Sequence, residues 1–139
     1  MSKLETPMVL KYWQQIGGTL IEEFPMVRAS ATCGPRYADA VILPRGEERR
    51  ITGSDRAAIL LEGEDVIVVQ AKASRLGMYL MGQTLFSAEL IRRFNPASVR
   101  SVALCTEDDS VLRPLFAPYP HVEVVVMAEF SSRTPRESH

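Results

Sequence analysis

The stretch DVIVVQAK, from Asp65 to Lys72, is the strongest structural signal in this chain. Its run of β-branched residues predicts a buried strand. Side chains alternate along a strand, so one face carries Val66, Val68, Gln70 and Lys72, and the other carries Ile67, Val69 and Ala71. An amide and an ammonium group at the end of so apolar a strand are costly to bury unless polar partners meet them.

The expected partner is Asp39, an acid on a second apolar segment, YADAVIL, over residues 37–43. Two interpretations follow from this juxtaposition. One is structural, with a buried ion pair between Asp39 and Lys72 and a hydrogen-bonded Gln70 amide. The other is a functional site in which the acid, the amide and the ammonium group act on a ligand.

An acid on one strand followed by a Gln-x-Lys pair on the next resembles the PD-(D/E)XK nuclease superfamily, and the Gln form looks most like the Mrr-type restriction endonucleases. The resemblance implies a restriction-endonuclease-like fold, DNA as the partner, and metal-dependent hydrolysis of phosphodiester bonds in restriction or repair. It implies that Asp39, Gln70 and the Ala71 carbonyl hold Mg²⁺ or Mn²⁺. In the same way, Lys72 is implied to orient or activate the attacking water.

Many superfamily members, Holliday-junction resolvases among them, add a Glu from the first helix. Glu5 stands ahead of the Gly17-Gly18 helix stop at a spacing similar to that of the resolvases, so it is the expected third acid and metal ligand. An acid in the first turn is also favoured simply by the helix dipole. Glu22 and Glu23 compete for the same role, and only one of two adjacent strand residues can face the site.

The rest of the pattern predicts an α/β domain with the element order αβββαβ followed by αβ. Strands are expected over residues 19–27, 37–43, 65–72, 99–104 and 122–127, and helices over about 7–16, 75–94 and, from a capping box at Thr106, to about 116. The polar segment 44–63 is expected to hold a short helix or an extra hairpin. The long crossover helix implies a parallel connection, so we expect a mixed five-stranded sheet flanked by helices. This order is the superfamily's common core, and the resemblance covers roughly residues 5 to 127.

Arginine carries most of the positive charge, with 13 Arg against 3 Lys, and six of the arginines lie between residues 28 and 56. Arginine suits bidentate phosphate contact, although a solvated face offset by neighbouring acids is the plainer interpretation. Arg36, Arg75 and Gln83 are the expected substrate-binding residues. Gln83 shares the predicted inward stripe of the long helix with Ser87, where a hydrogen-bonded core Gln is the alternative.

Length and composition predict a single domain over residues 1–130 and a polar, disordered tail over 131–139. Hydrophobic residues make up 46% of the chain, yet no apolar run approaches a membrane span or a signal peptide, so a cytoplasmic protein without membrane contact is expected. The net charge of −1 gives no global attraction to nucleic acid, which counts against a nuclease but leaves room for a local patch.

Three features depart from the superfamily's pattern: Ala38 rather than Pro precedes Asp39, Gln70 replaces the commoner Glu, and the interval between the two motifs is long. A lost carboxylate weakens the hold on a divalent ion, so the pattern supports the fold more strongly than the activity. Three functions stay open. The chain is an endonuclease, acting as a homodimer because one small domain cuts one strand; or a nuclease-fold binding module without catalysis; or an unrelated small α/β protein.

Overall fold

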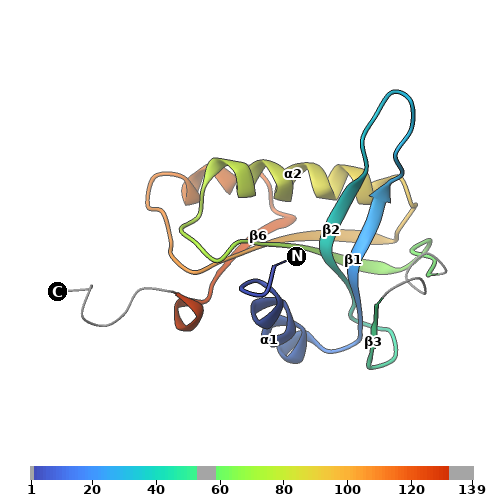
Figure 1. The fold of residues 1–139 in the computed structure, drawn as a ribbon, viewed down its shortest axis with the longest axis horizontal. Helices are drawn as coiled ribbons and strands as arrows, with labels where there is room; N and C mark the ends of the chain where they lie inside the picture. The colour runs from blue at the N-terminus through green and yellow to red at the C-terminus, as the bar shows by residue number, and fades with distance from the viewer. Residues whose placement is uncertain (1, 53–58, 132–139) are drawn as a thin grey trace.

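The structure is a computed structural model that describes residues 2–52 and 59–131. Its strands form a mixed six-stranded sheet in the order β3-β1-β2-β4-β5-β6, with an α-helix on each face (Figure 1). The α-helices are α1 (Thr6–Ile16) and α2 (Met78–Arg92). The strands are β1 (Thr19–Val27), β2 (Arg36–Leu43), β3 (Arg49–Ile51), β4 (Asp65–Ala71), β5 (Ser98–Cys105) and β6 (Val122–Val126). The tail expected over residues 131–139 lies outside the described residues, apart from Ser131.

The mixed α/β sheet is confirmed, with one strand more than the five expected. Strand β2 runs antiparallel to both β1 and β4, whereas β4, β5 and β6 run parallel to one another. The additional strand, β3, pairs in parallel with the start of β1 and buries Ile51 in the core. A strand of three residues is too short for alternation to reveal it in the sequence. In the part of the chain that the structure describes, neither α-helix has the length and apolar character that crossing a bilayer requires.

The prediction of a helix that begins at Thr106 is wrong, because Thr106 lies in the loop directly after β5. Thr106 is buried, and its backbone N–H donates to the Ser74 carbonyl (3.0 Å) in the loop that follows β4. Asp109 instead organises this loop, because its Oδ1 accepts from the N–H groups two and three residues further on, at 3.0 and 2.8 Å. Only a short 3₁₀ helix, η2 (Arg113–Phe116), follows.

A pair of glycines ends α1 and sets its position on the sheet. Gly17 and Gly18 both have positive φ, at 84° and 79°. A Cβ atom on Gly18 would lie 2.2 Å from the Leu43 carbonyl oxygen, so only glycine allows β1 to begin against the end of β2. The tight turn lays α1 back across one face of the sheet.

The predicted alternation in β4 is confirmed by the two layers of the core. Ile67, Val69 and Ala71 pack in the cluster that includes residues of α1. Val66 and Val68 pack in the cluster that includes Ile91 of α2. The polar end of β4 therefore faces α2 through Gln70.

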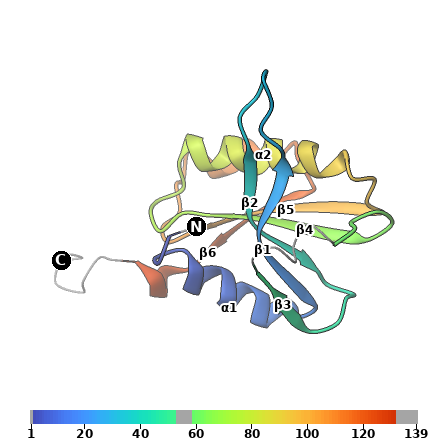
Figure 2. The same cartoon turned by 45° about the vertical axis from the view of Figure 1, so that its right-hand side comes forward.

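The β1–β2 hairpin bends away from β4 and projects past α2 (Figures 1 and 2). Strand β2 pairs with β4 only over Ala40–Ile42, although it pairs with β1 along nearly its whole length. Glu23 has a φ of 49° in the middle of β1, which marks a local kink in the hairpin. Beyond this kink β2 and β4 part. We call the region between residues 37–39 of β2 and residues 70–73 at the end of β4 the fork.

Candidate functional site

The side-chain amide of Gln70 spans the fork and takes the place of backbone pairing. Its Oε1 accepts from the Asp39 backbone N–H (3.3 Å), and its Nε2 donates to the Tyr37 carbonyl (3.4 Å). The same Nε2 donates to Ser87 Oγ on α2 at 2.9 Å. The amide thus satisfies two backbone groups that a continuing β2–β4 ladder would have paired.

Two carboxylates satisfy the edge of β4 that β2 has left. Asp39 Oδ2 accepts from the Ala71 N–H (2.8 Å), and Glu5 Oε2 accepts from the Ala73 N–H (3.0 Å). Between them, the Lys72 N–H points the other way and donates to a carbonyl of β5 at 2.9 Å. Because the N–H and C=O of a strand residue point to the same side, the Ala71 carbonyl also faces the fork. The fork is therefore lined by oxygen atoms.

The carboxyl group of Asp39 is held in an environment that opposes its charge. Burial raises the pKa of Asp39 above its ordinary value, and the negative charges of Glu5 and Glu23 raise it further, while the hydrogen bond from the Ala71 N–H lowers it. No Lys or Arg side chain among the described residues makes an ion pair with Asp39. A partly buried acid that is subject to the negative charges of two others is typical of a cation-binding or catalytic position.

Asp39→Asn is expected to raise the free energy of unfolding at neutral pH, because it removes a charge that folding makes costly. The folded-state pKa is raised, so the folded protein binds the proton more tightly than the unfolded chain. Stability contributed by Asp39 therefore falls as pH rises from about the ordinary value of 3.8 through the raised value. Urea denaturation across this range should show the gain from Asp39→Asn shrinking as the pH is lowered.

Asp65→Asn is the matched control, because Asp65 lies at the other end of β4 and has a cationic partner. Its Oδ2 is 2.8 Å from Arg45 Nε, and its Oδ1 accepts from the Ser98 hydroxyl. This substitution is expected to leave stability unchanged or to lower it slightly. An Asp39→Asn variant that loses stability at neutral pH, or a gain that is independent of pH, would contradict the unfavourable environment described for Asp39.

The structure separates the three candidates for the third acid. Glu22 is almost fully buried, and its Oε1 lies 2.9 Å from Arg50 Nη2 as an ion pair, although the two groups are not oriented for a hydrogen bond. Glu23 lies opposite Asp39 at the kink of β1, and its charge acts on that residue. Glu5 reaches the fork directly. Glu5 and Glu23 therefore border the fork, whereas Glu22 is paired with β3.

Lys72 lies at the same end of β4, but its side chain is exposed. The Lys72 ammonium group makes no hydrogen bond or ion pair with any described residue. The alternative interpretation of a buried ion pair between Asp39 and Lys72 is therefore wrong. Lys72 thus lies at the open edge of the fork, directly after Ala71 in the chain.

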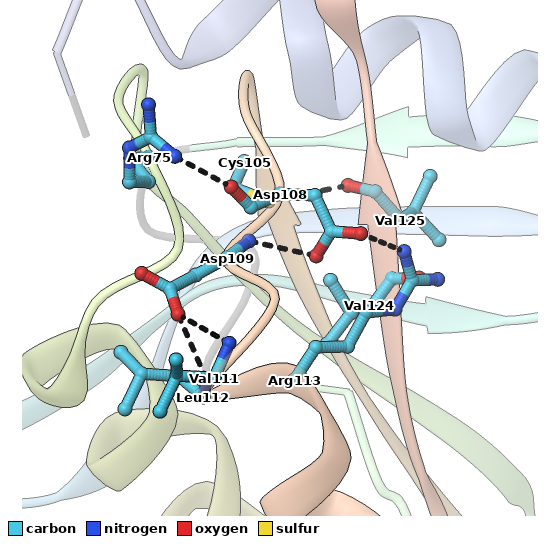
Figure 3. Close-up of polar contacts among 9 residues, drawn as sticks. All are labelled: Arg75, Cys105, Asp108, Asp109, Val111, Leu112, Arg113, Val124 and Val125. Atoms are coloured by element: carbon cyan, nitrogen blue, oxygen red, sulfur yellow. Dashed lines mark hydrogen bonds and ion pairs between the residues drawn. The ribbon is translucent and has the colours of Figure 1, made fainter.

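Arg75, an expected substrate contact, joins the loop between β4 and α2 to the loop after β5. Its Nη1 donates to the Asp108 carbonyl (3.1 Å) and its Nη2 to the Glu107 carboxylate (2.8 Å). Figure 3 shows the Arg75 side chain directed at the loop after β5, where Asp108 accepts from Arg113 at 2.9 Å. That guanidinium lowers the pKa of Asp108. Arg75 is thus a positioning residue for the loop that carries Lys72.

The other two expected substrate contacts, Arg36 and Gln83, line one cavity on the α2 side of the fork. Gln70 and Ser87 also line it. Ser87 is buried, as its predicted place on the inward side of the helix implies. The Gln83 side chain is exposed, so its predicted inward orientation is wrong. The exposed aromatic residues around the cavity were not anticipated. Their spacing on α2 was the available signal, but aromatic residues at helical spacing usually belong to a core.

The oxygen atoms of the fork fit a weakly held hard cation better than a tightly bound one. No group of three or more His, Cys, Asp or Glu side chains converges on a metal position within residues 2–52 and 59–131. A divalent ion would therefore depend on Asp39, the Gln70 amide oxygen, the Ala71 carbonyl and water, a set of hard oxygens that Mg²⁺ accepts. Glu5, the expected third metal ligand, reaches the same fork but uses Oε2 to accept from the Ala73 N–H. Comparisons of the chain with protein-family models, with curated proteins and with solved structures found no match in any of the three.

Proposed function

We propose that this chain is a metal-dependent nuclease of the restriction-endonuclease-like fold that hydrolyses phosphodiester bonds of DNA. The observation that carries the proposal is the fork, where Asp39 and Gln70 meet at the point at which β2 and β4 part. The α2 crossover between the parallel strands β4 and β5 supports the proposal, because the element order αβββαβ that the resemblance implies contains such a connection. The long interval between the two motifs is accommodated by β3 and the segment around it.

Asp39, the Gln70 amide oxygen and the Ala71 carbonyl would hold Mg²⁺ or Mn²⁺, and the ion would offset negative charge on the phosphate. The raised pKa of Asp39 supports this assignment, because a cation would relieve the repulsion among Asp39, Glu5 and Glu23. Gln70 would have to weaken its long 3.3 Å contact with the Asp39 N–H to share its oxygen. Binding is therefore expected to be weak.

The residues of the chain divide the remaining work between positioning and electrostatics. Glu5 accepts from the Ala73 N–H and so fixes the backbone on one side of Lys72, while the Arg75 contacts fix it on the other. The exposed Lys72 ammonium would orient the attacking water and meet the negative charge that develops on the phosphate. Glu5 and Arg75 act in this proposal as positioning residues.

A second candidate function, a nucleic-acid-binding module without catalysis, is favoured by the state of Gln70. Its oxygen and its amide nitrogen all have protein partners across the fork, so the side chain is fully used in holding β2 to β4. Binding an ion through the Gln70 oxygen would weaken these hydrogen bonds and so lower the stability of the fold. The two candidates differ in whether a divalent ion binds and whether DNA is cut.

Mg²⁺ or Mn²⁺ is expected to raise the melting temperature of the wild-type protein in a concentration-dependent way, because a ligand that binds only the folded state stabilises it. Asp39→Asn should abolish the shift, since it removes the charged ligand. Asp65→Asn, the same change at the opposite end of β4, should retain it. Differential scanning fluorimetry with and without EDTA measures the effect, and equal shifts in wild type and Asp39→Asn would exclude this metal site.

The activity itself is tested by incubating the protein with supercoiled plasmid or branched DNA and Mg²⁺ or Mn²⁺. The proposed nuclease should convert supercoiled plasmid to the nicked form, and EDTA should stop the conversion. Retention of DNA in a gel shift without any nicking would instead favour the binding module.

A further inference from the structure

A cavity of about 420 Å³ opens between the outer face of α2 and the projecting β1–β2 hairpin. Its aromatic lining comes from both elements, with Tyr37 on β2 and Tyr79 and Phe86 on α2. Its polar lining includes Ser87, Gln83 and Gln70. Figures 1 and 2 show the arrangement of these two elements, with the β1–β2 hairpin projecting past α2.

The aromatic residues of this cavity are exposed to a degree that the fold does not require. Tyr79 is 79% exposed, Phe86 69% and Tyr37 52%. Tyr79 and Phe86 lie two helical turns apart on one side of α2, so both rings border the same opening. Large apolar groups gathered around a concavity mark a ligand surface more often than a solvated one.

The polar groups of the cavity favour a ligand with a flat ring and hydrogen-bonding edges. The Gln83 amide makes no hydrogen bond with a described residue, and it offers both donors and an acceptor. Arg36 stands at the rim with an exposed guanidinium that uses Nη1 to donate to the Pro35 carbonyl (3.0 Å), which leaves its other N–H groups for an anion. Aromatic faces, an adaptable amide and a cation are the groups that bind unpaired nucleotides.

Gln70 connects this cavity to the fork. Its amide nitrogen contacts Ser87 in the cavity wall, and its oxygen contacts Asp39 in the fork. A nucleotide whose base entered the cavity would therefore have its sugar and phosphate next to the oxygen atoms of the fork. The volume suits a single nucleoside and falls within the range of small-molecule sites.

We infer that the cavity binds the base of an unpaired nucleotide, so that the substrate class of this protein is single-stranded or locally unpaired DNA. The inference rests on the proposed function, because the base site gains its meaning from the fork beside it. Stacking on Tyr79 and Phe86 provides affinity for any base, and Gln83 can pair with different base edges. The protein thus prefers a loose strand or a junction over continuous duplex, whatever its sequence.

The test measures fluorescence anisotropy of a short fluorescein-labelled oligothymidylate at low salt with EDTA present, so that binding is separated from cleavage. Tyr79→Ala and Phe86→Ala are each expected to weaken binding about tenfold or more, the effect of losing one stacked base. Tyr79→Trp should keep the affinity, because it retains a stacking face. Both alanine variants should melt like wild type, since the rings they remove are exposed.

Tyr119→Ala is the matched control, because Tyr119 is another exposed tyrosine, in the loop before β6, and is not among the cavity residues. It should bind the oligonucleotide like wild type. A blunt duplex of the same length should bind more weakly than the single strand and be insensitive to Tyr79→Ala. Equal affinity of all variants, or no binding up to about 100 µM, would overturn the inference.

The same variants distinguish failure of the inference from failure of the proposed function. Oligothymidylate binding that depends on Tyr79, in a protein that cuts no DNA, would support the base site and reject the nuclease. Metal-dependent nicking that is unaffected by Tyr79→Ala and Phe86→Ala would support the nuclease and reject the base site. A molar mass measured by light scattering that falls to the monomer in these variants would show that the aromatic wall is a contact between two copies of the chain, and would overturn the base site.

Discussion

Replacing Lys72 with alanine is expected to lower metal-dependent nicking of plasmid or branched DNA by about 100-fold or more, while DNA retention in a gel shift changes little. The expected loss is the usual effect of removing an electrostatic or acid–base group from a site of phosphate hydrolysis. Lys72 is suited to the role because its side chain is exposed at the rim of the fork and has no described ion-pair partner. Its removal should therefore cost no stability.

Lys11→Ala is the matched control for this prediction. Lys11 is one of only two other lysines, and it forms an ion pair with Glu129 on the surface of α1. Its loss should leave nicking unchanged. Lys72→Arg tests the chemistry further, because a guanidinium keeps the positive charge but does not give up its proton and has a different shape. Full activity in Lys72→Ala would remove this residue from the mechanism and leave the nuclease proposal without a side chain that orients the attacking water.

Gln70→Ala is expected to lower the free energy of unfolding by about 3 kcal/mol, because it leaves three buried or partly buried polar partners without this hydrogen bond and opens a cavity between β4 and α2. The partners are the Asp39 N–H, the Tyr37 carbonyl and the Ser87 hydroxyl. Urea denaturation measures the loss. Gln83→Ala is the control, since an exposed glutamine on α2 should change stability by no more than about 0.5 kcal/mol.

Gln70→Glu separates the structural role of this residue from a metal-binding role. A carboxylate can still accept from the Asp39 N–H, but it cannot donate to the Tyr37 carbonyl, and it adds a negative charge beside Asp39. We expect this variant to be less stable than wild type in EDTA and to gain more melting temperature from Mg²⁺ or Mn²⁺, because the site then has a second acid. A loss of stability that no divalent ion reverses would show that Gln70 only holds the fork together.

Local patterns in the sequence determined most of the individual elements. Alternation in the stretch from Asp65 to Lys72 predicted which side chains share each face of β4, because the two-residue period of a strand does not depend on its neighbours. The glycine pair after α1 predicted where that helix stops, since a positive φ is a local property of the backbone. The same local reasoning identified Asp39 and Gln70 as polar groups on apolar strands, whereas Glu5 was expected from the resemblance.

Only the tertiary structure decided how these groups meet. The divergence of β2 from β4 depends on a hairpin that bends at Glu23 and packs beside α2. Neither the bend nor the packing can be predicted from a short window of sequence. That divergence is why Gln70 pairs with backbone groups, and why an aromatic cavity opens next to the fork. Long-range contacts also decided the partners of Arg75, which binds the loop after β5, and of Glu22, which forms an ion pair with Arg50 of β3. The residue types that carry the chemistry follow from the sequence, whereas their partners follow from strand divergence and packing across the whole sheet.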